Sequence, residues 1–143
     1  MADFRKLLVW QKAHQLALDV ERVAAGVARR KQALTRQLER AADSVPANIA
    51  EGRGRVTDAD FAHFVAIAIG SVTEVESHLQ RGYDAGVIPE REYTDLTESA
   101  IEVRKMLIGL RRTLRGQQRR PVSVNSGGAS PGATAPASPD TVS

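Results

Sequence analysis

The sequence predicts an all-α protein: an antiparallel, up-down-up-down bundle of four helices, followed by a disordered C-terminal tail. Four segments repeat one spacing, with apolar residues three or four positions apart. This spacing is typical of helices that pack at shallow angles. No segment alternates apolar and polar residues with the period of two that a half-buried strand shows. The connections between the segments are short, so neighbouring helices should be antiparallel.

The four apolar stripes place the helices along the chain. The first stripe covers 9–27 and advances in steps of 4, 3, 4, 3 and 4 residues. The others cover 34–49, 61–79 and 93–114. The residues of the four stripes are, in order, Val9, Ala13, Leu16, Val20, Val23 and Val27; Leu34, Leu38, Ala41, Val45 and Ile49; Phe61, Val65, Ala68, Val72, Val75 and Leu79; and Tyr93, Leu96, Ala100, Val103, Leu107, Leu110 and Leu114.

Residues between the stripes fit the starts and ends of helices. Thr57 or Asp58 is expected to cap the third helix, because its side-chain oxygen can accept a free backbone N–H. Pro89 suits the first turn of the fourth helix, where its missing N–H would have no partner. Gly52 and Gly54 are expected to supply positive φ where the second helix ends.

Pro46 opposes this pattern, because it lies inside the second helix. A proline there removes a backbone hydrogen bond and costs about 3 kcal/mol or more. We therefore expect a kink at Pro46, which would aim Asn48, Glu51 and the loop 53–55 in a direction that a straight helix could not.

The composition divides the chain into a bundle domain, residues 1–120, and a tail, residues 121–143. The tail has no Lys, Arg, Leu, Ile, Phe, Tyr or Trp, so it cannot bury enough apolar surface to offset the entropy of ordering it. The chain has no cysteine, which excludes disulfides and thiolate chemistry. No apolar run approaches the roughly 20 residues of a membrane span, and no secretory signal is visible. We expect a cytoplasmic protein that does not enter a membrane.

A polar stripe runs beside the apolar stripe of the second helix: Gln37, Arg40, Ser44, Asn48 and Glu51. The structural interpretation is a hydrogen-bonded network between the second and third helices or between subunits, since buried amides and carboxylates must be paired. The functional interpretation is a contact surface for a ligand or RNA. We favour the structural one.

The third helix carries Gly70 and Ser71, although glycine inside a helix costs up to about 1 kcal/mol relative to alanine. We expect the close approach of another helix to offset this cost, with Ser71 bonding to Asn48 or Glu51. The predicted polar motif comprises Arg40, Ser44, Asn48, Glu51, Gly52, Gly70, Ser71 and Glu74.

The signs of catalysis are weak. A carboxylate pair such as Glu51 and Glu74 could perform acid–base chemistry or hold a metal, but no cysteine or Gly-rich phosphate loop accompanies it. His14, His63 and His78 are not three or four residues apart, so no single helix presents a metal-binding pair. We predict that the protein is not an enzyme and has neither a catalytic residue, a metal site nor a cofactor.

The motifs resemble those of the 23S rRNA intervening-sequence protein family. The resemblance covers roughly Phe4 to Leu114 and rests on Val9-Trp10-Gln11-Lys12-Ala13-His14, on Ser44-Val45-Pro46-Ala47-Asn48-Ile49-Ala50-Glu51-Gly52 and on Gly70-Ser71. It implies a bacterial, left-handed four-helix bundle that assembles as a homopentamer, in a family whose biochemical function is not established. It also implies a relation to the accessory variability protein of diversity-generating retroelements, a pentamer that binds nucleic acid and a reverse transcriptase.

Basic residues form clusters along the bundle domain, which contains all 20 Lys and Arg. In an up-down-up-down bundle, the loop 53–55 and the end of the fourth helix share one pole, and 29–31 lies at the other. We predict that the first pole dominates polyanion binding. The candidate phosphate contacts are Arg29, Arg30, Lys31, Arg36, Arg53, Arg55, Arg111, Arg112 and Arg115.

These features predict a non-catalytic, oligomeric module that binds nucleic acid, RNA or DNA, with RNA preferred. The alternative is a homo-oligomeric protein-assembly scaffold, such as a reverse-transcriptase accessory subunit, that does not bind nucleic acid by itself. The distribution of the basic side chains distinguishes the two: convergence on one face favours binding, and scattered pairs with Asp and Glu favour the scaffold.

Overall fold

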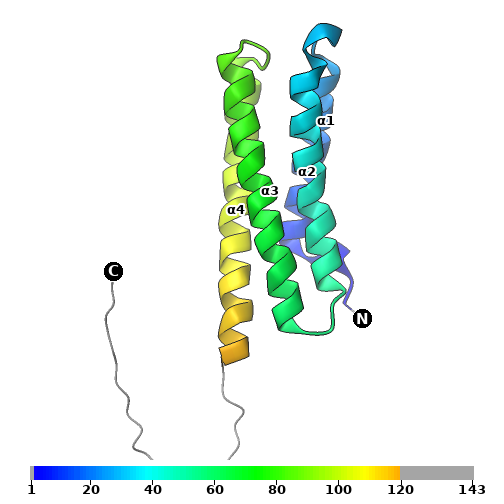
Figure 1. Ribbon diagram of the computed structural model, residues 1–143, viewed down its shortest axis with the longest axis vertical. Helices are drawn as coiled ribbons and strands as arrows, with labels where there is room; N and C mark the ends of the chain where they lie inside the picture. The colour runs from blue at the N-terminus through cyan, green and yellow to red at the C-terminus, as the bar shows by residue number, and fades with distance from the viewer. Residues whose placement is uncertain (1, 120–143) are drawn as a thin grey trace, which may run out of the picture.

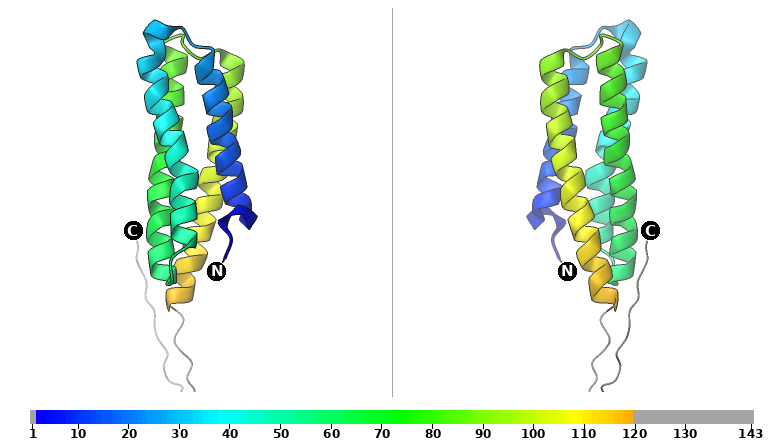
Figure 2. Two further views of the ribbon diagram at one scale, coloured as in Figure 1. Left: turned by 90° about the vertical axis from the view of Figure 1, so that its right-hand side faces the viewer. Right: turned by 90° about the vertical axis from the view of Figure 1, so that its left-hand side faces the viewer.

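A computed structural model describes residues 2–119, which form four long helices. These are α1 (Leu8–Ala25), α2 (Gln32–Arg53), α3 (Asp58–Asp84) and α4 (Glu90–Arg119), with two short 3₁₀ helices, η1 (Phe4–Lys6) and η2 (Arg29–Lys31). The long helices lie side by side and alternate in direction (Figures 1 and 2), which confirms the predicted bundle. The predicted tail and its boundary lie outside the described residues.

The core consists of the inward faces of all four helices. Val20, Val45, Val72 and Leu107, one from each helix, are fully buried. α3 packs against both α2 and α4, whereas α2 and α4 face each other across the diagonal. The first helix is shorter than its predicted stripe, because it ends before Val27. Within residues 2–119, no helix is both long and apolar enough to cross a membrane.

The predicted helix ends are confirmed in part. The Thr57 hydroxyl caps α3 by accepting a hydrogen bond from the Asp60 backbone N–H at 3.1 Å. Pro89 directly precedes α4, and its carbonyl accepts from Tyr93 N–H at 2.9 Å. The prediction of positive φ at the end of α2 is wrong. Within the described residues, the glycine with positive φ is Gly86, at 73°, and it lies in the α3–α4 turn.

Gly52 has a different role, which is to let α3 approach α2 closely. A Cβ atom on Gly52 would lie 2.8 Å from Phe61 Cδ1 and 2.8 Å from Phe64 Cβ, distances that real Cβ atoms do not adopt. Gly70 shows the opposite: an added Cβ would meet nothing within 4 Å. The expectation that another helix of the same chain approaches Gly70 is therefore wrong.

Pro46 is buried within α2, and the helix continues through it from Gln32 to Arg53. The residues that follow Pro46 stay on the same helix, so Asn48 and Glu51 keep the helical spacing that the sequence predicted for them.

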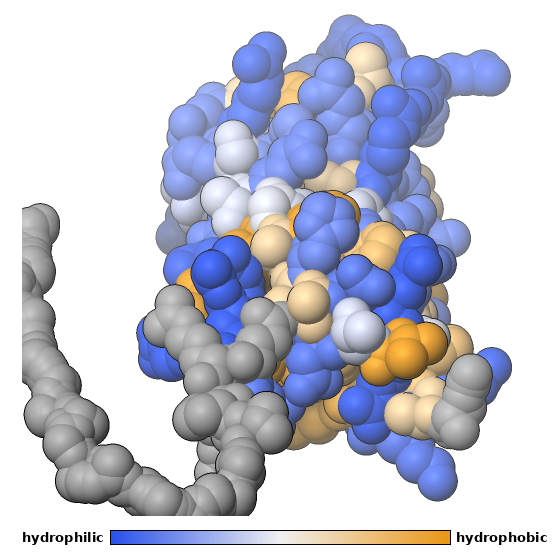
Figure 3. Space-filling view, turned by 60° about the horizontal axis from the view of Figure 1, so that its bottom comes forward, coloured by the Kyte–Doolittle hydropathy of each residue, from blue (hydrophilic) through white to orange (hydrophobic). Residues whose placement is uncertain are grey.

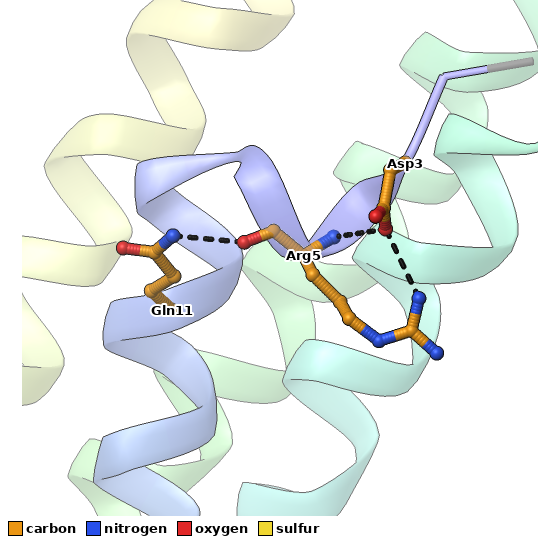
Figure 4. Close-up of polar contacts among 3 residues, drawn as sticks. All are labelled: Asp3, Arg5 and Gln11. Carbon is orange, nitrogen blue, oxygen red and sulfur yellow. Dashed lines mark hydrogen bonds and ion pairs between the residues drawn. The ribbon is translucent and has the colours of Figure 1, made fainter.

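The N-terminal residues are tied to the first helix by the contacts in Figure 4. The Asp3 carboxylate accepts hydrogen bonds from the Arg5 backbone N–H at 3.0 Å and from the Arg5 guanidinium at 3.1 Å. The backbone N–H bond is the main cause that lowers the pKa of Asp3 below its ordinary 3.8. Gln11 Nε2 donates to the Arg5 carbonyl at 2.8 Å, which holds η1 against α1.

Candidate nucleic-acid interface

The candidate phosphate contacts lie at the two ends of the bundle, as predicted. Arg29, Arg30 and Lys31 form η2, at the end that also holds the α3–α4 turn, and Arg36 follows in the first turns of α2. At the opposite end lie the last turn of α2 with the loop 53–55 and the C-terminal turns of α4 (Figures 1 and 2). The five arginines of this second end are Arg53, Arg55, Arg111, Arg112 and Arg115.

Arg53 and Arg55 are engaged with their own chain. The Arg55 guanidinium donates to Glu51 at 2.8 Å and lies 4.7 Å from the centre of the Phe64 ring. Arg53 is half-buried, 6.0 Å from the centre of the Phe61 ring. Both contacts are of the cation–π type. α2 and α4 do not pack against each other in the described residues, so Arg53 belongs to a helix that is not a direct neighbour of the α4 arginines.

Arg111, Arg112 and Arg115 have no acidic partner within residues 2–119. Residues 104–120 contain no Asp or Glu, so their own helix supplies no counter-charge at this end. They lie in the C-terminal third of α4. Their positive charge is therefore available to a ligand.

Arg104 differs from these three arginines. It belongs to the same basic stretch, but its Nε donates to Glu76 of α3 at 2.6 Å, and both side chains are about three-quarters buried. This pair holds α3 against α4, and it removes Arg104 from the charge that faces solvent. Sequence analysis missed it because the partners lie 28 residues apart.

A groove between α3 and α4 brings the three unpaired arginines together. It has a volume of about 350 Å³ and is lined by Ile69, Ile108, Arg111, Arg112, Arg115 and Gly116. Figure 3 brings this end of the bundle forward and shows hydrophobic side chains exposed among hydrophilic ones. The residues predicted from the sequence did not include Ile69 and Ile108. Both are isoleucines outside the apolar stripes, and that position is the signal that could have identified them.

The polar motif of α2 and α3 contains a true interhelical network. The Ser44 and Ser71 hydroxyl oxygens are 2.7 Å apart, and Asn48 Nδ2 donates to the Ser44 carbonyl at 2.8 Å and to its hydroxyl at 3.0 Å. The expected bond from Ser71 to Asn48 or Glu51 is wrong, since Ser71 bonds to Ser44. These partly buried groups join the two helices.

The outer members of the motif do not join this network. Glu51 is exposed and pairs with Arg55, and Glu74 is exposed and lies 3.4 Å from His78. The expected participation of both carboxylates is therefore wrong. Gln37, Arg40, Ala41, Ser44 and Glu74 instead border an open groove of about 450 Å³ on the α2–α3 face.

The histidines and acids of the described residues do not gather into a metal-binding cluster. His14 is exposed and stacks on Trp10, with ring centres 4.7 Å apart. Glu51 and Glu74 each bond to a different neighbour, so the carboxylate pair considered from the sequence is not assembled.

The fold and the surface define a small antiparallel four-helix bundle with an arginine-rich end. The sequence profile of the 23S rRNA-intervening sequence protein family matches residues 5–109, and the chain belongs to this family. A crystal structure from the S23 ribosomal protein family of Bacteroides thetaiotaomicron, of a protein of unknown function, is similar in fold with a TM-score of 0.70. At 22% identity it covers 73% of this chain and 96% of its own. No curated protein matches this chain.

Proposed function

We propose that this chain is a non-catalytic, homo-oligomeric module that binds nucleic acid, preferably RNA, through the arginines near the end of α4. The observation that carries the proposal is the groove around Arg111, Arg112 and Arg115, which have no acidic partner in the described part of the chain. A cluster of unpaired guanidinium groups attracts polyanions and forms charge-assisted bonds with phosphate. The family name, which refers to 23S rRNA, supports RNA as the polyanion.

The oligomer in this proposal is the pentamer that the family resemblance implies. Its support in this chain is an uncovered stretch of α3, where Ile67 is 40% exposed and Gly70 has open space around it. Ala47 of α2 is also exposed. Small and apolar side chains of this kind permit close contact between helices of different subunits. Assembly would repeat the α4 arginines around the oligomer and raise its affinity for a polymeric anion.

The test is the binding of a mixed-sequence RNA to the full chain at two salt concentrations. Arg112→Ala/Arg115→Ala removes two exposed charges from the groove, and Arg29→Ala/Arg30→Ala removes two exposed charges from the other end as a matched control. We expect the first pair to cause the larger loss and to reduce the salt dependence of binding by about one phosphate contact per arginine removed. If the unaltered chain does not bind RNA at low salt, the proposal is wrong.

The second candidate is the protein-assembly scaffold, including a reverse-transcriptase accessory subunit. It is favoured by the ion pairs that engage other basic residues: Lys12 lies 3.3 Å from Glu102, Arg55 pairs with Glu51, and Arg104 pairs with Glu76. A scaffold would keep its oligomeric state in the absence of RNA and would bind a protein partner after nuclease treatment. Purification with and without nuclease separates the two candidates.

A further inference from the structure

We infer that the α3–α4 groove takes single-stranded RNA, with phosphates on the three arginines and one base against Ile69 and Ile108. The inference rests on the proposed nucleic-acid function and adds the form of nucleic acid that the site accepts. It depends on one juxtaposition: unpaired cations and exposed apolar side chains line the same groove.

The three arginines of α4 line the groove together. Arg111 and Arg115 are four residues apart, which places them on one face of α4, about 6 Å apart along its axis. Arg112 lies beside Arg111 and also lines the groove. Each guanidinium can bind two phosphate oxygens through its planar fork of N–H donors.

The apolar floor of the groove, which Ile69 and Ile108 form, is not explained by phosphate binding alone. Ile108 of α4 is 36% exposed, and Ile69 of α3 is half-buried; both line the groove. A hydrated phosphate gains nothing from an isoleucine, whereas the face of an unstacked base buries apolar surface against it. Gly116 adds no side chain and has nothing within 4 Å of an added Cβ, so it leaves one end of the groove open.

The bases of a double helix cannot reach Ile69 and Ile108 in this groove. These bases are stacked inside, and an A-form duplex offers a protein mainly phosphates, 2′-hydroxyls and a wide, shallow minor groove. Single strands can splay a base out of the chain. Among the described residues that line the groove, the arginines are the ones with hydrogen-bonding side chains, so the base contact should tolerate any of the four bases.

The experiment measures the affinity of the full chain for three probes of equal length: a single-stranded RNA, an abasic sugar–phosphate strand, and the RNA duplex. Ile108→Ser removes the exposed part of the floor. Leu18→Ser is the matched control, because Leu18 is 43% exposed on α1 but does not line the groove. Thermal unfolding of both variants checks that they remain folded.

We expect the single strand to bind at least about threefold more tightly than the abasic strand. Ile108→Ser should lower single-strand affinity to the abasic level without changing abasic binding, and Leu18→Ser should change neither. Equal affinity for the single and abasic strands, or an equal effect of the two serine variants, overturns the inference and leaves the proposed function standing. Absence of binding to all three probes overturns both.

Discussion

The Ser44 hydroxyl of α2 meets the Ser71 hydroxyl of α3 at 2.7 Å, and Asn48 holds Ser44 in place by donating to both its carbonyl and its hydroxyl. Ser71 is 8% exposed. A hydroxyl this deep between helices needs a partner, since an unpaired polar group costs free energy when it leaves water. The pair therefore fixes how α2 and α3 align along their axes.

The first prediction is that Asn48→Ala lowers the free energy of unfolding by about 1–3 kcal/mol, because Ser44 loses a donor in a partly buried place. Thermal or urea unfolding measures it. Glu74→Ala is the control on the exposed part of the motif and should change stability by no more than about 0.5 kcal/mol. An unchanged midpoint for Asn48→Ala, together with lost RNA binding, would instead support the binding-surface interpretation of the polar stripe.

The second prediction separates two glycines. Gly52→Ala should destabilise by about 1–3 kcal/mol, because its methyl group would overlap Phe61 and Phe64. Gly70→Ala should stabilise the isolated subunit by up to about 1 kcal/mol, because the helix gains propensity in open space. Denaturation at a concentration below assembly compares them, and equal effects of the two substitutions would contradict the packing of α3 described above.

The third prediction concerns assembly. If the exposed face around Ile67 and Gly70 forms the subunit contact, the full chain should have the mass of a pentamer in light scattering or native mass spectrometry. Gly70→Leu, which fills open space on the single subunit, should then shift the population toward smaller species. A monomer across micromolar concentrations excludes the pentamer.

The fourth prediction uses the half-buried ion pair between α3 and α4. Glu76→Gln should lower the free energy of unfolding by about 1–2 kcal/mol, because Arg104 would keep its charge without its ionic partner. Glu51→Gln, in an exposed pair, should cost less than about 1 kcal/mol. The same loss in both variants would show that the Arg104 pair is no more important than a surface contact.

The fifth prediction is a local transition in acid. The lowered pKa of Asp3 means that its contribution to the N-terminal cap is present above the ordinary value of 3.8 and is lost as the pH falls through the lowered value. Trp10 is the only tryptophan, and its ring lies 5.0 Å from that of Phe4 in η1, so its fluorescence should report release of η1. Asp3→Asn should abolish this transition. If the transition persists in Asp3→Asn, the cap is not its cause.

The sequence predicted the bundle because helix periodicity is local: Val20, Val45, Val72 and Leu107 each follow from spacing along one segment. The Thr57 cap was predictable for the same reason. The roles of Gly52 and Gly70 could not be predicted, because spacing along one helix does not show which neighbouring helix approaches a residue without a side chain. The Glu76–Arg104 pair required the register of α3 against α4, which no local pattern contains.

The candidate site also combines features that local sequence patterns predict with features that depend on how the helices pack. The charge of Arg111, Arg112 and Arg115 and its position at one pole could be predicted from composition and helix direction. The engagement of Arg55 by Glu51, four residues earlier, is a local pattern that the sequence also contains. The groove itself could not be predicted, because it combines Ile69 of α3 with residues of α4 that come about 40 positions later.

The N-terminal segment and the last turns of α4 lie at the same end of the bundle as the arginine groove (Figure 2). An affinity tag or fluorescent fusion at the N-terminus would therefore attach at the same end as the groove, where a charged tag could mask or mimic its electrostatics. The turn around Gly86, at the far end, is the better insertion point for a label in every experiment on RNA binding.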